Sequence, residues 1–162
     1  MVKLDEKNCI ILDLLQDDCR MSLTEISKKV GLSVDSVKKR VEKLRAEGIF
    51  FSKIQLRPRH FGFPYIVEAK VKTHNYDTTK IKAFIDYLVD HPRVAELLAI
   101  SGEWNYTIVL LAKDHEDLAD ITNEIRTRFA DIINEWSESL TTVVYKFERY
   151  DMPRLMGLKV TE

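Results

Sequence analysis

The stretch "SLTEISKKVGLSVDSVKKRVEKLRAEG", from Ser22 to Gly48, has the spacing of two short helices joined by a tight turn. Ser22 stands three residues before Glu25, which is the capping-box arrangement that begins a helix, and Gly31 is suited to end it. Ser33 then begins a second helix, which Gly48 can end with a left-handed cap. Two helices with this short connection are typical of a helix-turn-helix.

A further helix is expected before these two. Asp5 opens a segment in which apolar residues recur at spacings of one, three and four, as on one face of a helix: Ile10, Ile11, Leu14 and Leu15. The polar run "DDCRMS" interrupts this pattern. The sequence therefore predicts a helix-turn-helix domain over residues 1–50, and the breakers in "IFFSKIQLRPRHFGFP" predict a connecting strand and loop over residues 51–64.

From residue 65 onward the pattern changes to strands that alternate with helices. Alternation predicts strands at 65–73, 94–100, 106–112 and 142–149, the last one with Val143, Tyr145 and Phe147 on its buried face. Helical spacing predicts one helix around residues 81–88 and another over 118–129. The order β-α-β-β-α-β favours a ferredoxin-like, four-stranded antiparallel sheet over residues 65–149, with both helices on one face and a C-terminal tail at 150–162. The fold class is α+β.

Charge is distributed unevenly between the two parts. Residues 1–60 hold 13 Lys or Arg against 9 Asp or Glu, a balance of +4, whereas residues 61–162 hold 12 against 17, a balance of −5. A local positive charge decides which surface can approach a polyanion. No apolar stretch approaches the roughly 20 residues that a membrane span needs. We therefore expect a cytoplasmic protein.

The helix that begins at Ser33 has an apolar face and a basic face. Val37, Val41 and Leu44 share its inner face, so polar and basic residues occupy the outer face and its flanks. Short polar groups near a helix N-terminus and cations along its exposed side suit the major groove of DNA. The predicted DNA-binding residues, including phosphate contacts near the start of the preceding helix, are Arg20, Ser22, Thr24, Ser33, Asp35, Ser36, Lys38, Lys39, Arg40 and Lys43. The alternative is a solvated helix face without a partner.

The chain resembles the leucine-responsive/asparagine regulator (Lrp/AsnC, feast/famine) family of transcription factors along nearly its whole length. The resemblance rests on "LDEKNCIILDLLQDDCRMSLTEISKKVGLSVDSVKKRVEKLRAEGIF", on "SKIQLRPRHFG", and on the turn within "AISGEWNYTIVLLAKD". It implies an N-terminal winged helix-turn-helix that binds double-stranded DNA. It also implies a βαββαβ module that forms homodimers, assembles them into tetramers or octamers, and binds small effectors, usually amino acids.

The turn "SGEWNY" is the predicted effector site under this resemblance. Gly102 would free backbone amides for a carboxylate, and Glu103 would meet an ammonium group. The predicted effector-binding residues are Ser101, Gly102, Glu103, Asn105, Tyr106 and, in the last predicted strand, Thr142. The family usually has Asp where this chain has Asn105, so the effector differs or is absent. A simple hairpin turn would use the same glycine.

Two other functions remain open at the level of sequence. The basic cluster in "RPRHFGF", at Arg57, Arg59 and His60, could bind an anion, as in proteins similar to this family that decarboxylate haem precursors. A ligand-independent protein that compacts DNA is the other alternative. We predict no metal site and no cofactor, because the histidines are scattered outside any metal-ligand spacing. The favoured prediction is a sequence-specific DNA-binding regulator that is not an enzyme.

Overall fold

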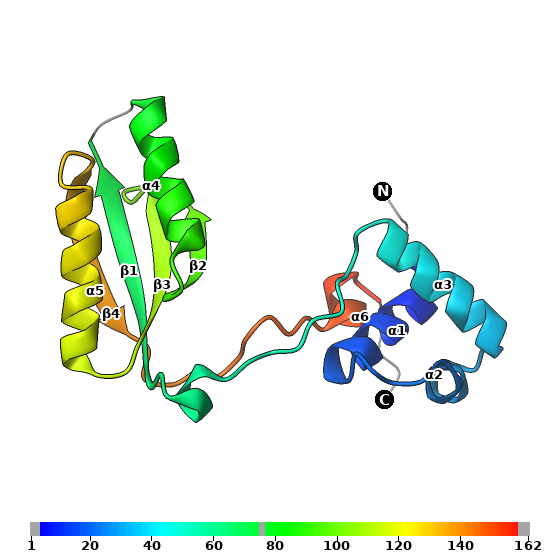
Figure 1. Cartoon of the computed structure of the whole chain (residues 1–162). Coiled ribbons are helices and arrows are strands. Elements are labelled where there is room, and N and C mark those ends of the chain that lie inside the picture. The colour runs from blue at the N-terminus through cyan, green and yellow to red at the C-terminus, as the bar shows by residue number, and fades with distance from the viewer. Residues whose placement is uncertain (1–3, 75–76, 159–162) are drawn as a thin grey trace. The chain divides into compact units, whose positions relative to one another are not determined.

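The computed structural model describes residues 4–74 and 77–158, which fold into two compact units (Figure 1). The helical unit comprises residues 1–55 and 145–162, and the sheet unit comprises residues 56–144. The chain therefore passes between the units twice, once on the way into the sheet unit and once on the way out. This division corrects the predicted boundaries, because the end of the chain belongs with its beginning.

The helical unit contains the three predicted helices and a short fourth one. Their bounds are α1 Glu6–Asp17, α2 Leu23–Val30, α3 Val34–Ala46 and α6 Met152–Leu155. The caps are those that the sequence predicts: the capping box of Ser22 with Glu25 begins α2, and Gly31, at φ 67°, ends it. Helix and turn therefore follow from local chemistry at both ends of α2.

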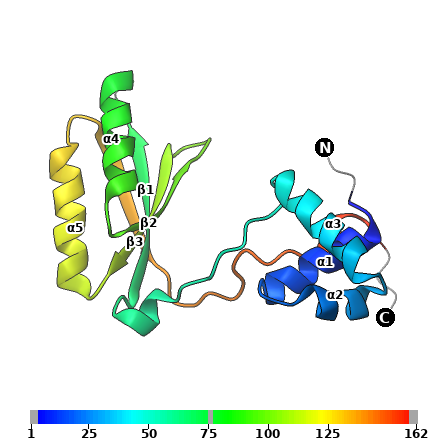
Figure 2. The ribbon, with the colours of Figure 1, turned by 45° about the vertical axis from the view of Figure 1, so that its right-hand side comes forward.

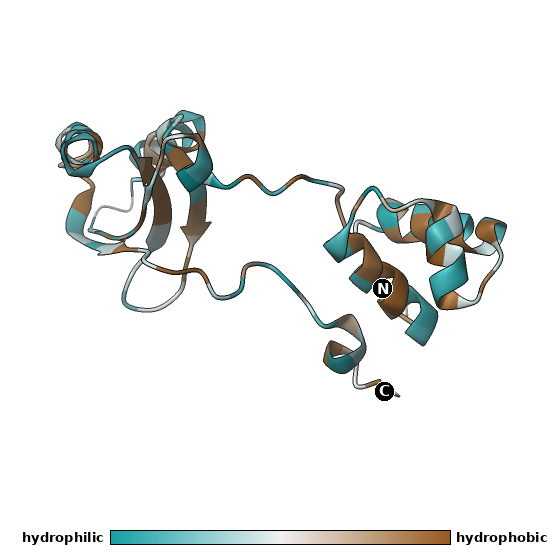
Figure 3. Cartoon of the chain, turned by 90° about the horizontal axis from the view of Figure 1, so that it is seen from below, coloured by the Kyte–Doolittle hydropathy of each residue, from teal (hydrophilic) through white to brown (hydrophobic). Residues whose placement is uncertain are grey.

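A small apolar core holds these helices together. It comprises Ile11, Ile26, Val30, Val37 and Val41, each at most 8% exposed. The apolar stripe of α1 is visible as brown residues in Figure 3. Each helix presents one such stripe, so none of the three can bury its apolar surface without the other two.

No strand forms among the described residues of the helical unit, so these residues do not form the wing that the resemblance implies. Residues 50–57 lack regular structure. Phe51 and Ile54, in the segment whose beginning looks strand-like in sequence, are 75% and 77% exposed. A strand needs a partner for its backbone hydrogen bonds, and this segment pairs with no other.

The sheet unit has the predicted β-α-β-β-α-β order. Its bounds are β1 Tyr65–Thr73, α4 Thr78–Asp90, β2 Val94–Ala99, β3 Tyr106–Ala112, α5 His115–Arg128 and β4 Ile133–Leu140, preceded by a 3-10 turn at Pro58–Phe61. The strand order is β2-β3-β1-β4, and every neighbouring pair is antiparallel. Both helices cover the same face of the sheet (Figure 2).

The core of the sheet unit lies between this face and the two helices. Val67, Ala69 and Val71 alternate along β1 with residues of the other face, and each is at most 1% exposed. Phe84 of α4 is fully buried, and its ring centre lies 5.1 Å from that of Phe129 in an edge-to-face arrangement. This core fixes the ends of the strands, where the candidate effector turn lies.

The predicted position of the last strand is wrong. The strand that pairs with β1 is β4, in register from Val67 opposite Leu140 to Thr73 opposite Ile133, and not residues 142–149. Its sequence, "INEWSESL", is polar because β4 is an edge strand, so its backbone pairing rather than apolar alternation holds it in place. The β-branched and aromatic residues of "TVVYKFER" lie beyond the sheet, where Tyr145 is 94% exposed.

Candidate nucleic-acid interface and effector site

The outer face of α3 is the surface that the sequence assigns to DNA, and no described part of the helical unit covers it. Val37, Val41 and Leu44 are buried at 0%, 8% and 1% exposure. Lys39 and Lys43 lie on the other side of the helix and are exposed. The helical periodicity therefore separates the two faces as predicted, and the basic side points away from the core.

The cations on this face lack counterions close by. The side chains of Lys39 and Lys43 take part in no ion pair or hydrogen bond with any residue that the structure describes. Lys38 lies 4.0 Å from Glu42 in a pair that is more than half exposed. An exposed pair of this kind contributes little. Positive charge on the outer side of α3 is therefore available to an external anion.

The two serines at the helix starts serve as caps. Ser22 Oγ accepts a hydrogen bond from the Glu25 amide at 3.2 Å and donates one to Glu25 Oε2 at 2.6 Å. Hydrogen bonds from the hydroxyl and amide of Ser22 hold the pKa of Glu25 below its usual range. Ser33 Oγ accepts from the Ser36 amide at 3.2 Å and donates to Ser36 Oγ at 2.9 Å. These caps hold the first turns of α2 and α3 in a fixed geometry, and the predicted DNA contacts of the two serines stay predictions.

Arg40 does not lie free on the outer face. Its Nη1 atom is 2.7 Å from Asp5 Oδ2 and 2.8 Å from Asn8 Oδ1, so it joins α3 to the first turn of α1. Burial raises the pKa of Asp5, but the Asn8 amide and the Arg40 guanidinium outweigh it and bring that pKa below its usual value. We therefore reassign Arg40 from DNA contact to the scaffold that positions α3.

The remaining predicted residues are exposed. Asp35 lies in the first turn of α3, Thr24 in that of α2, and Arg20 precedes α2 with its amide donating to Asp18 Oδ1 at 2.8 Å. Sequence reasoning omitted Lys28 and Lys29, which are exposed in the last turn of α2, just before the turn into α3. The adjacent lysines in "SKKVGLS" were the signal that could have identified them.

The effector turn predicted from sequence connects β2 to β3. Gly102 has φ 133°, a backbone conformation that side-chain-bearing residues rarely adopt, and it is exposed together with Ser101 and Glu103. Asn105 fastens the turn to the end of β1: its Oδ1 accepts from the Thr73 amide at 2.8 Å, and its own amide donates to the Val71 carbonyl at 2.9 Å. The side-chain oxygen of Asn105 is therefore engaged in holding the turn.

A cavity of about 490 Å³ opens beside this turn, between the ends of β1 and β3 and one face of α4. Its lining comprises Thr73, Thr78, Ile81, Lys82, Ile85, Asp86, Asn105 and Tyr106. The cavity thus brings Asn105 and Tyr106 together with residues of α4 that sequence reasoning did not select. Ser101, Gly102 and Glu103 are not part of its lining.

Thr142 lies away from this cavity. The amide of its neighbour Thr141 donates to the Ile66 carbonyl at 2.8 Å, whereas Asn105 contacts Thr73. Seven residues of extended β1 separate Ile66 from Thr73, which is roughly 23 Å at about 3.3 Å per residue. Thr142 and the turn therefore occupy opposite ends of the sheet within one chain.

One residue of the basic cluster in the connecting segment, Arg59, contacts the sheet unit itself. Arg59 donates to the carbonyls of Thr141 and Thr142 at 2.5 and 2.9 Å. None of Arg57, Arg59 and His60 lines the cavity beside the turn. Within residues 4–74 and 77–158, the acidic, histidine and cysteine side chains form no group that could hold a metal ion. No helix in those ranges has the length and apolar character needed to cross a membrane.

Comparison with known proteins gives two family matches that together span most of the chain. Residues 4–45 match the AsnC-type helix-turn-helix domain, and residues 66–146 match the Lrp/AsnC ligand binding domain. The transcriptional regulator LrpA of Pyrococcus horikoshii is 36% identical over 119 residues, which are 73% of this chain and 82% of LrpA. LrpC of Bacillus subtilis is 31% identical over 126 residues, or 76% of this chain and 84% of LrpC.

Solved structures show the same fold. A transcriptional regulator from Neisseria meningitidis, crystallised as a complex with L-methionine, superposes with a TM-score of 0.84 at 19% identity, covering 94% of this chain and 99% of that one. At this identity the similarity concerns the fold. The element order and the four-stranded antiparallel sheet described above are therefore shared with known regulators.

Proposed function

Because this chain belongs to the Lrp/AsnC family of DNA-binding transcriptional regulators, we propose that it reads a specific DNA sequence through α3 and adjusts its binding to an amino acid. The observation that carries the proposal is the outer side of α3, where Lys39 and Lys43 are exposed and have no counterion among the described residues. Lysines in this position bind phosphates and fix the register of the helix in the groove. We assign contacts with base edges to Asp35 and Ser36, which lie in the first turn of α3.

The cavity beside α4 is our candidate for the effector site. Lys82 and Asp86 form an ion pair one helical turn apart on its rim, and Ile81, Ile85 and Tyr106 supply apolar surface. A free amino acid carries a carboxylate and an ammonium group that can replace each partner of this pair, while its side chain lies against the apolar residues. The L-methionine complex of the Neisseria meningitidis regulator supports an effector of this chemical class.

We propose that the chain acts as a homodimer or a larger assembly of dimers. The two segments that connect the units carry exposed apolar side chains, among them Phe51, Ile54 and Val143. Both segments include brown, hydrophobic stretches of ribbon in Figure 3. The sheet face away from the helices also bears Leu98, which is 50% exposed. A second copy would cover both surfaces. Two copies of α3 related by a two-fold axis would bind a roughly palindromic site with half-sites about one DNA turn apart, or a multiple of it.

Footprinting on DNA upstream of the protein's own gene, with and without each amino acid, tests this function. We expect protection of a defined site, and a change in its extent or affinity with at least one amino acid, most strongly one with an apolar side chain. Equal binding to every sequence, unaffected by any amino acid, would instead indicate an architectural DNA-binding protein. Since relatives are regulators and DNA is the proposed partner, we propose no enzymatic step and a cytoplasmic location.

A further inference from the structure

The segment that begins at Arg149, most of which is predicted from sequence only as a tail, docks on α1 inside the helical unit. The side-chain amide of Gln16 donates to the Tyr150 carbonyl at 3.0 Å, and its oxygen accepts from the Tyr150 amide at 2.9 Å. The Gln16 side chain is a primary amide with a donor and an acceptor side by side, so it pairs with the Tyr150 backbone as a neighbouring strand would. This pair fixes the position of residue 150 along α1.

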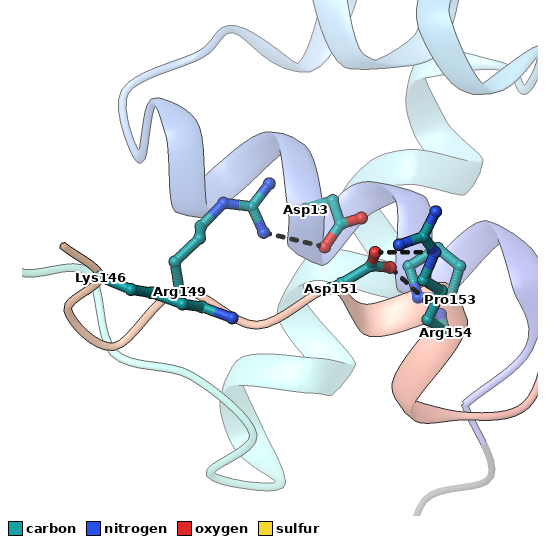
Figure 4. Close-up of a pocket in the computed structure, with 6 residues that line it drawn as sticks. All are labelled: Asp13, Lys146, Arg149, Asp151, Pro153 and Arg154. Atoms are coloured by element: carbon teal, nitrogen blue, oxygen red, sulfur yellow. Dashed lines mark hydrogen bonds and ion pairs between the residues drawn. The ribbon is translucent and has the colours of Figure 1, made fainter.

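Two carboxylates of α1 hold the residues on either side of Tyr150, and Figure 4 shows the pairing of one of them, Asp13, with Arg149. Asp13 Oδ1 accepts from the Met152 amide at 3.1 Å and lies 3.3 Å from Arg149 Nη1. Asp17 Oδ1 accepts from Arg149 Nε at 3.1 Å. Asp13 is only one-quarter exposed, so its interaction with Arg149 is less screened than that of an open surface pair. The docked segment then continues into α6, whose start is capped by Asp151.

The same connection is anchored at its other end in the sheet unit. Arg59 binds the carbonyls of Thr141 and Thr142, and the Thr141 amide continues the pairing with β1 at Ile66. Only residues 143–148 lie between these anchors and Arg149. Six residues span at most about 22 Å when fully extended, so the connection is short as well as fixed at both ends.

We propose that residues 149–158 act as a clasp, so that the sheet unit holds its DNA-binding unit by two tethers instead of one. A single flexible linker would let that unit rotate about its attachment. A second short tether anchored on α1 restricts this rotation, and with it the range of half-site spacings that a dimer can bridge. This inference rests on the proposed DNA-binding function for its consequence, but the clasp itself is a property of the protein alone.

Hydrogen exchange tests the clasp directly, in the full-length protein without DNA. The variant is Gln16→Ala with Arg149→Ala, which removes two of the side chains that dock the segment and leaves a good helix former at residue 16 of α1. The control is Arg154→Ala, because Arg154 is 79% exposed and pairs only with Asp151 of its own segment among the described residues. We expect the amides of Tyr150 and Met152 to exchange slowly in the wild type and the control, and about tenfold faster or more in the double variant.

The functional consequence is tested on DNA whose half-sites are moved apart by about half a helical turn. The wild type and the control should lose affinity for the respaced site, whereas the double variant should bind both spacings within about threefold of each other. Fast exchange in the wild type, slow exchange in the double variant, or unchanged spacing preference in that variant would overturn the proposal. If the wild type binds no DNA, the proposed function fails, while hydrogen exchange still decides whether the clasp exists.

Discussion

Cations are treated differently in the two units. In the sheet unit Lys72 lies 2.9 Å from Glu135 and Lys80 lies 2.5 Å from Asp131. Arg93 is paired with Asp117 and is further fixed by the Leu111 carbonyl. On the outer side of α3, Lys39 and Lys43 have no such partner among the described residues. These cations of the sheet unit are neutralised internally, whereas the two lysines on the outer side of α3 are left for a partner.

This difference explains how a chain of net charge −1 binds a polyanion. Paired lysines would have to give up a carboxylate before meeting a phosphate, whereas unpaired lysines displace only water and small ions. Release of the counterions that surround DNA then supplies the favourable free energy. The acidic balance of residues 61–162 keeps that part of the surface away from phosphates.

Placing a charge inside the helical core should have the largest effect, because it should destabilise the helical unit and leave the stability of the sheet unit unchanged. Val41→Asp puts an unpaired carboxylate at a site that is 8% exposed in the wild type, at a cost of roughly 3 kcal/mol or more. We expect the helical unit to unfold while the sheet unit retains its own melting transition. Glu42→Asp, at the neighbouring exposed position, is the control and should leave both transitions unchanged. An unchanged melting transition of the helical unit in Val41→Asp would mean that this core does not determine the stability of the unit.

Removing one unpaired cation should weaken DNA binding without altering stability. Lys39→Ala is expected to lower affinity about tenfold, which corresponds to about 1.4 kcal/mol. Lys82→Ala is the matched control, because it removes an exposed lysine from the sheet unit and should leave DNA affinity unchanged in the absence of effector. The measurement is fluorescence anisotropy at fixed salt together with a melting curve. Equal losses in both variants would remove the distinction between the units.

Arg40 should behave as a structural residue in spite of its place in the basic helix. Arg40→Ala breaks its contacts with Asp5 and Asn8 and should destabilise the helical unit by about 1 kcal/mol. Because Arg40 is next to Lys39 in sequence, the two alanine variants form a direct contrast in the same assays. An unchanged melting temperature with a large loss of affinity would return Arg40 to the DNA surface.

The smallest expected effect concerns pH. The pKa of Asp5 in the folded protein lies below its ordinary value of 3.8, so its stabilising contribution is present above pH 3.8 and is lost as the pH falls through the folded value. Asp5→Asn keeps the cap of α1 but cannot titrate. The difference in melting temperature between wild type and Asp5→Asn should therefore shrink below pH 3.8. A difference that is constant down to the folded pKa would show that the charge of Asp5 contributes nothing.

Local signals in the sequence predicted most of the fold. Capping at Ser22 and Ser33, the glycine at residue 31, and the two apolar periods identify α2, α3 and the β-α-β-β-α-β order. The last strand was misplaced because β4 is a polar edge strand held by backbone pairing with β1, while the more strand-like "TVVYKFER" lies outside the sheet. The docking of residue 150 on Gln16 was not predictable, since it joins residues 134 positions apart through a single side-chain amide.

For the candidate sites too, local features could be predicted from the sequence and long-range contacts could not. Helical periodicity separates the outer face of α3 from its core, so Lys39 and Lys43 were correctly placed on the exposed side. Periodicity does not show that the long side chain of Arg40 reaches the cap of α1. The cavity beside the effector turn forms only where α4 packs near the ends of β1 and β3. No motif in the sequence predicts this tertiary contact.

The salt dependence of DNA binding by the double variant Lys39→Ala, Lys43→Ala tests most directly whether the exposed side of α3 binds the phosphate backbone. The wild type should show a linear fall of log K with log salt, with about −0.9 for each phosphate that it neutralises. The double variant should show a slope shallower by about 1.8, since two phosphate contacts are lost. An identical slope in both proteins would contradict the assignment of α3 as the DNA-binding surface.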